Sequence, residues 1–110
     1  MIETTLLNYL SRKLSVPVKM EKPERPFGKM VFLERTGGSG WFLKESTFAI
    51  QSYADSMYDA AELNEQVIEA MQSMDELDEI RSVDLNSTYN FTDTVTKNYR
   101  YQAVFDIKHY

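Results

Sequence analysis

The residues that could do chemistry are few, and they do not combine into a reaction centre. Ser39 lies between Gly38 and Gly40, but the triplet lacks the Gly-x-Ser-x-Gly spacing of a nucleophile turn. The same glycines lack the Lys-Ser/Thr pair that completes a phosphate loop. The single histidine, His109, could serve as a general base or a ligand. Because it falls at the end of a predicted strand, we expect it on the surface, and we expect no catalytic residue.

Carboxylates gather in two places without the partners that a metal site needs. Glu62, Glu65 and Glu69 share one face of a predicted helix, but di-metal bundles add a Glu-x-x-His motif that is missing here. Residues 75–79 are acidic and lack the glycine of a calcium loop. The chain has no cysteine, which removes thiolate ligands and disulfides. We therefore expect solvated acidic surfaces, no metal and no cofactor.

The charge distribution argues against direct binding to nucleic acid. Residues 51–90 carry ten acidic side chains and one basic one, and the net charge of the whole chain is −5. An acidic protein gains nothing from the release of counterions by phosphates. The basic residues between Arg12 and Lys29 are interrupted by Glu21 and Glu24. The aromatic residues of the last two predicted strands could stack on bases, but their alternation favours packing in the core.

Length and composition indicate one soluble domain over residues 1–110. The chain has 110 residues, of which 43% are hydrophobic and 26% charged, as is ordinary for a globular protein. Such a length suffices for one core without disulfides or metals. The sequence has no apolar stretch long enough to span a membrane and no basic, apolar leader. A reducing cytoplasm suits a chain of this kind.

The first half of the chain predicts one helix followed by strands. Apolar residues repeat every four positions over residues 2–15, which predicts a helix that Pro17 ends. Residues 16–20 are expected to be extended, and residues 21–28 form a loop with two prolines. Residues 29–36 predict a strand, and residues 37–40 a flexible glycine turn. Residues 41–43 and 46–53 are predicted to be strand.

The second half predicts a helix and a long hairpin. Ser56 caps a helix that runs to about Met74, with Val67 and Ile68 among its buried positions. Residues 83–91 and 99–107 alternate between apolar and polar side chains, which predicts two paired antiparallel strands. Their connecting loop, residues 92–98, should stand at the domain surface. The predicted fold is α+β in the order α-β-β-β-α-β-β, with an antiparallel sheet and both helices on one face.

Several segments together resemble the tail terminators of long-tailed, non-contractile bacteriophages, which are also described as minor tail or head–tail joining proteins. The matching stretches are residues 31–38, residues 50–56 leading into residues 60–63, residues 89–93 and residues 99–102, preceded by an opening helix. The likeness covers most of the chain. The acidic segment at residues 75–79 and the long loop at residues 92–98 depart from the pattern. The family has no catalytic residues, so none is expected here.

The resemblance implies a virion protein that assembles into a hexameric ring in the host cytoplasm. The ring would cap the tail tube, meet the head–tail connector and let DNA pass without specific binding. Separate acidic and basic regions suit contacts between unlike patches of neighbouring copies. Some carboxylates of residues 55–84 are expected to face the channel and repel DNA. The residues expected at protein interfaces are Gly37, Gly38, Ser39, Gly40, Thr94, Val95, Thr96 and Lys97.

Two other classes remain open at this stage. The chain could be another phage neck or head-closure component with a similar α+β fold. It could also be a small non-viral domain that binds proteins. Neither alternative requires catalysis, a membrane or a bound small molecule.

Overall fold

The computed structural model describes residues 1–21 and 28–110. Helix α1 (Ile2–Lys13) buries one face, on which Ile2, Leu6 and Leu10 repeat every four positions. Its last turn carries basic side chains, which suit the negative end of the helix dipole. The predicted helix over residues 2–15 is confirmed, and it ends two residues earlier because Leu14 is already extended.

A five-stranded sheet follows the predicted element order. Its strands are β1 (Val18–Lys19), β2 (Met30–Ser39), β3 (Lys44–Ala54), β4 (Ile80–Asn90) and β5 (Tyr99–His109), with helix α2 (Met57–Gln72) and the short 3-10 turn η1 (Met74–Glu76) between β3 and β4. The order across the sheet is β1-β2-β3-β5-β4. Strand β1 pairs parallel to β2, and every other pair is antiparallel. The α+β prediction is confirmed. The loop predicted at residues 21–28 lies mostly outside the described residues.

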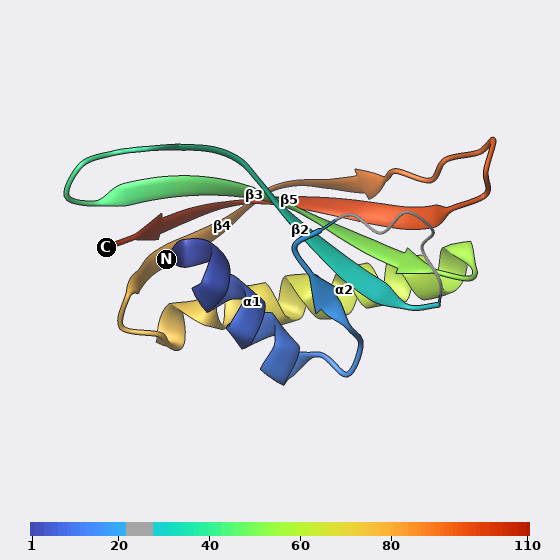
Figure 1. The fold of residues 1–110 in the computed structure, drawn as a ribbon, viewed down its shortest axis with the longest axis horizontal. Coiled ribbons are helices and arrows are strands. Elements are labelled where there is room, and N and C mark those ends of the chain that lie inside the picture. Colours follow the sequence, from blue (N-terminus) through green and yellow to red (C-terminus); the bar gives the residue numbers. More distant parts are fainter. Residues whose placement is uncertain (22–27) are drawn as a thin grey trace.

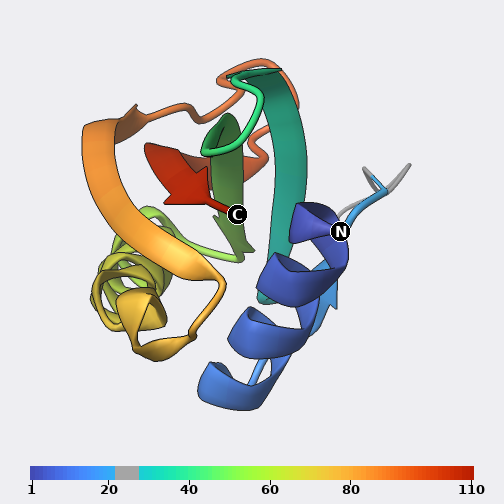
Figure 2. The same cartoon turned by 90° about the vertical axis from the view of Figure 1, so that its left-hand side faces the viewer.

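Both helices cover the same face of the sheet (Figure 1). Helix α2 packs against the central strands β3 and β5, and α1 lies beside it under β1 and β2 (Figure 2). The two helices and the facing strand positions form one core, which includes Leu6, Leu10, Val31, Leu33, Phe48, Ile50, Leu63, Val67, Met71, Ala103, Phe105 and Ile107. The predicted cap of α2 is present, because the Ser56 hydroxyl accepts a hydrogen bond of 3.1 Å from the Asp59 amide.

The β2–β3 hairpin corrects two predictions. Residues 37–39 continue strand β2 instead of forming a flexible turn, and they pair with residues 45–47 of β3. Residues 41–43, predicted as strand, form the exposed end of the hairpin. The reason is register: a ladder that continues to the Ser39–Glu45 pair leaves only residues 40–43 to close the hairpin.

Strand β4 corrects a third prediction, the strict alternation from Val83 to Phe91. The pairing with β5 shifts by one residue between Leu85 and Ser87. Such a bulge moves every following side chain to the other face. Val83 and Leu85 therefore lie on the helix side, whereas Tyr89 and Phe91 lie on the opposite side and are exposed. Tyr89 of β4 and Phe91, which follows the strand, are thus surface residues, whereas Phe105 of β5 is fully buried as predicted.

The sheet face opposite the helices carries a small cluster and a polar chain. Met30, Phe32 and Tyr53 are buried there. The Tyr53 hydroxyl donates to Gln51 Oε1 at 2.8 Å, and Gln51 Nε2 donates to Gln102 Oε1 at 2.9 Å. These bonds join β3 to β5 across the centre of the sheet. Their polar atoms are therefore satisfied within the sheet.

The molecule is elongated, with extents of 43 × 24 × 22 Å. The turn of the β2–β3 hairpin and the loop of the β4–β5 hairpin stand at opposite ends of the long axis (Figure 1). None of the described helices is both long enough and apolar enough to cross a membrane. Among the residues that the structure describes, the two hairpin ends extend furthest along the long axis.

Candidate functional site

The sequence-predicted interface residues fall into two separate groups. Gly37, Gly38, Ser39 and Gly40 lie at the β2–β3 end, and Thr94, Val95, Thr96 and Lys97 lie at the β4–β5 end (Figure 1). The structure does not bring the two groups together. They are two candidate interaction sites, and their chemistry differs.

The turn of the β2–β3 hairpin depends on Gly40. Its φ is +100°, a conformation that side chains rarely adopt. A Cβ at this position would also collide with the Leu43 carbonyl oxygen. Gly40 therefore lets the chain fold back from β2 into β3 at this point.

The residues after Gly40 form an apolar tip, defined here as Trp41, Phe42 and Leu43. Trp41 is 95% exposed and Phe42 is 82% exposed. Neither side chain contributes to the core. The sequence predicts a strand at these residues, so their exposure was missed, although their apolar side chains are evident in the sequence. Adjacent exposed aromatic residues of this size are typical of an interaction surface.

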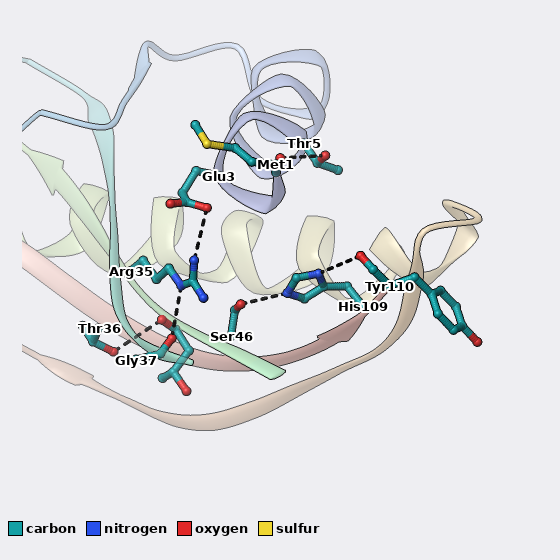
Figure 3. Close-up of polar contacts among 10 residues, drawn as sticks. Met1, Glu3, Thr5, Arg35, Thr36, Gly37, Ser46, His109 and Tyr110 are labelled. Carbon is teal, nitrogen blue, oxygen red and sulfur yellow. Dashed lines mark hydrogen bonds and ion pairs between the residues drawn. The ribbon is translucent and has the colours of Figure 1, made fainter. Parts of the chain in front are cut away.

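A pocket of about 610 Å³ lies behind the tip, between the start of α1, the end of β2 and the end of β5. Glu3, Arg35, Lys44, Glu79 and His109 are among the residues that line it. Figure 3 shows that Arg35 reaches from β2 toward Glu3, with 3.6 Å between Nη1 and Oε1. Charges of both signs line the pocket, so it does not select an anion or a cation.

Arg35 lies across the neighbouring backbone because position 38 is glycine. Its Nε donates to the Gly37 carbonyl oxygen at 3.3 Å. A Cβ on Gly38 would collide with the Arg35 guanidinium. The ion pair with Glu3 is partly exposed, and such pairs contribute about 0–1 kcal/mol. Gly38 thus allows the contact that ties α1 to the base of the hairpin.

His109 is 6% exposed, which corrects the prediction that it lies on the surface. Its Nε2 shares a hydrogen bond of 2.8 Å with Ser46 Oγ, and its Nδ1 lies 3.3 Å from the Tyr110 carbonyl oxygen (Figure 3). A carbonyl oxygen can only accept, so Nδ1 is the donor in that contact. The alternation that turns Phe105 and Ile107 inward also turns His109 inward, and this signal could have located it.

The Ser46–His109 pair does not form a nucleophile and base that a substrate can reach. Ser46 is completely buried, and no carboxylate orients the ring, because Nδ1 is directed at a backbone carbonyl. A triad requires an accessible hydroxyl and an oriented imidazole. The pair instead links β3 to the last residues of β5 beneath the tip.

The β4–β5 end is closed by its own hydrogen bonds. The Asp93 carboxylate accepts from the Val95 amide at 3.0 Å and from the Thr96 amide at 3.4 Å. The hydrogen bond from the Thr96 side chain, together with these amides, lowers the pKa of Asp93 from its ordinary value. Lys97 takes a positive φ of 57°, and Asp93 bridges to Asn98 below the loop. Val95 is 90% exposed at the extreme end.

Arg100 fixes the base of this second end. Its Nε donates to the Phe91 carbonyl oxygen at 2.6 Å, and its guanidinium carbon lies 4.4 Å from the centre of the Phe91 ring. Its Nη1 donates to the Tyr53 hydroxyl at 3.1 Å. One side chain of β5 therefore contacts both β3 and the residue that follows β4. Cation–π contacts of this kind contribute about 0.5–1 kcal/mol at exposed sites.

The acidic residues of α2 form a solvated face, as predicted. Glu62, Glu65 and Glu69 are all exposed. Among residues 1–21 and 28–110, no three acidic, histidine or cysteine side chains gather as a metal site would require. Within the same ranges the two ion pairs are Lys13–Glu76 and Arg35–Glu3, so these three carboxylates have no basic partner there.

Comparisons with the models of known protein families and with curated protein sequences find no match for this chain.

Proposed function

We propose that this chain is a structural subunit that assembles with copies of itself into a ring, and that the ring is the tail terminator of a long, non-contractile bacteriophage tail. The exposed apolar tip is the main support for self-assembly. Exposing Trp41 and Phe42 to water is unfavourable, and burying such a side chain contributes about 1.5–3 kcal/mol. The resemblance over most of the chain supports the terminator role.

The two ends suggest a division of work within the proposed particle. Unlike patches that meet in a head-to-tail manner generate a ring when the rotation closes. We assign the apolar tip to the contact between copies in the ring. The residues of the β4–β5 end, Thr94 to Lys97, are assigned to the tail tube or the head–tail connector.

The acidic middle of the chain fits a channel that DNA crosses without binding. Carboxylates on such a wall repel phosphates, and they remove the counterion release that favours binding. The exposed acidic residues that follow α2, from Asp75 to Asp84, are candidates for this wall. No reaction forms part of the proposed role, which depends on shape and contact alone.

Particles made without this protein provide the test of the terminator role. Tails of irregular length, seen by electron microscopy of a phage that lacks it, would support a terminator. Full heads that leak DNA would instead identify a head-closure component and overturn the terminator assignment. Rings of the purified protein should weaken between about 50 mM and about 1 M salt if charge pairs join the copies.

A further inference from the structure

The apolar tip is carried at the end of a paired hairpin. The β2–β3 ladder continues to the Ser39–Glu45 pair, and Gly40 sets the reversal immediately afterwards. The strands beneath the tip need no ordering when the tip docks, which lowers the entropic cost of binding. Tryptophan is also enriched among the residues that dominate binding energy at protein interfaces. Trp41 therefore has the features of an anchor residue.

A groove of about 420 Å³ lies on the helical side of the molecule, between the end of α1 and the second half of α2. Leu14 and Ala70 supply its apolar part. Its polar lining comes from Lys13, Ser15, Gln66, Glu69 and Ser73. An indole has an apolar body and a single N–H donor. Gln66, Glu69 and the serine hydroxyls offer acceptors for that donor.

The charges around the tip and the groove are complementary. Lys44 follows the tip and is exposed, and residues 35–44 contain no carboxylate. Glu45 is the next residue, so its side chain lies on the opposite face of β3 from that of Lys44. The groove is bordered by Glu69, and Glu62 and Glu65 lie on the same exposed helix face. Lys13 also lines the groove, but its Nζ lies 3.5 Å from Glu76 Oε1, and the carboxylates on this helix face outnumber it. The cation Lys44 beside the tip therefore complements the carboxylates that border the groove.

We propose that Trp41 of one copy inserts into the groove between α1 and α2 of the next copy, and that Lys44 pairs there with Glu69. This inference rests on the proposed assembly into a ring. Tip and groove are different patches of one chain, so the contact is head-to-tail and each copy gives one tip and receives one. The carboxylates left for the channel are then those beyond α2.

The size of the tip also favours a ring over an isolated pair. An aromatic side chain buries about 150–250 Å², whereas each partner in a standard interface contributes about 800 Å². A single tip thus gives a weak pairwise contact. Closure of a ring gives every copy two such contacts, which strengthens the assembly without any new surface.

Trp41 is the only tryptophan of the chain, so its fluorescence reports the tip directly. We would record the emission maximum and quenching by acrylamide while light scattering follows the mass over a concentration series. The expected result is a blue shift and a severalfold loss of quenching over the same concentrations at which the mass rises. A rise in mass with Trp41 still fully quenched would overturn the inference and leave the proposed ring intact.

Two further outcomes separate the possible failures. A mass that stays at that of one chain at every concentration would overturn the proposed ring itself. A blue shift with phosphatidylcholine–phosphatidylserine vesicles, without any on assembly, would show a membrane-binding tip and also overturn the inference.

Matched variants identify the groove. Gln66→Phe fills the groove and should abolish the blue shift, whereas Gln72→Phe, at an exposed α2 position outside the groove lining, should leave it unchanged. Glu69→Lys should weaken assembly at least tenfold, and Lys44→Glu in the same chain should restore it. Circular dichroism checks that all variants fold. Equal effects of Gln66→Phe and Gln72→Phe, or no rescue by the charge swap, would contradict the assigned groove.

Discussion

The two hairpin ends of this molecule differ in how the side chains of their projecting loops are bonded. The β4–β5 end satisfies itself: Asp93 accepts two backbone amides, and Arg100 joins the base of the loop to Phe91 and Tyr53. The β2–β3 end has ordered strands beneath it, but its tip presents Trp41 and Phe42 to water. One end is internally bonded and exposes the single apolar side chain of Val95, whereas the other exposes two adjacent aromatic side chains.

This difference indicates which end gains most from a partner. Hydrogen bonds that are already made within a loop add little to the free energy of binding when the loop docks. Replacing them by hydrogen bonds to a partner changes the free energy only slightly. Exposed apolar area, in contrast, gains stability in proportion to what is buried. In the proposed assembly, we therefore assign the affinity to the β2–β3 end and a defined shape to the β4–β5 end.

The largest expected effect comes from the strands that support both ends. Phe105 is fully buried at the centre of the sheet, and Phe105→Asp places an uncompensated charge there. We expect a loss of several kcal/mol in the free energy of unfolding, which is enough to unfold the domain. Val95→Asp, at the exposed β4–β5 end, is the control and should leave the thermal midpoint unchanged. A folded Phe105→Asp protein would contradict the core described above.

The next effect separates the two ends in assembly. Trp41→Ser combined with Phe42→Ser should weaken self-association by at least tenfold, because two large apolar side chains no longer become buried. Urea unfolding of the same variant should change by less than about 0.5 kcal/mol, since neither side chain touches the core. Analytical ultracentrifugation measures the first quantity. Val95→Ser should leave self-association as it is, and an equal loss would erase the contrast between the ends.

A loop replacement tests the second end. Substituting residues 94–97 by Asn-Gly should leave a folded protein that still forms rings, because the Asp93–Asn98 bridge already closes the hairpin below. We expect such rings to fail to complete tails in an infected cell, which plaque counts and electron microscopy would reveal. Infectious particles at normal yield would remove the proposed role of this end.

The smallest expected effect concerns a carboxylate on the sheet between the two ends. Hydrogen bonds from Asn86 and Thr47 lower the pKa of Asp106 from its ordinary value. A lowered pKa in the folded state means stabilisation that is present at neutral pH and lost as the pH falls below about 3.9 and through the lowered value. Asp106→Asn should therefore cost less than about 1 kcal/mol at neutral pH, because solvent screens this partly exposed carboxylate.

Urea unfolding at two pH values measures this contribution. The difference between the native protein and Asp106→Asn should shrink toward zero in strong acid. A difference that is independent of pH would show that the side chain acts through packing and not through its charge.

Local signals in the sequence were sufficient for most of the fold. The four-residue repeat of α1, the Ser56 cap of α2 and the alternation in β5 each depend on near neighbours, and all three are confirmed. The misplaced segments depend on pairing between distant residues. The register of β2 against β3 decided that residues 37–39 are strand and that Trp41 is exposed, and no local pattern contains that register.

The same reason explains the sites that were missed. The bulge between Leu85 and Ser87 exposes Tyr89 and Phe91, although their spacing alone predicts burial. His109 was predicted to be exposed from its position, whereas its pairing beside Lys44 on β3 encloses it. Residues 37–40, which were predicted to lie at an interface, are found at one end of the molecule, but their neighbours Trp41 and Phe42 carry its most exposed apolar surface.

The mass of the protein in solution tests the central claim most directly. Light scattering coupled to size-exclusion chromatography, over a range of concentrations, should show a closed species at a fixed multiple of the 12.8 kDa chain, with ring-shaped particles in the electron microscope. A species that stays at 12.8 kDa up to the highest concentration would contradict the account.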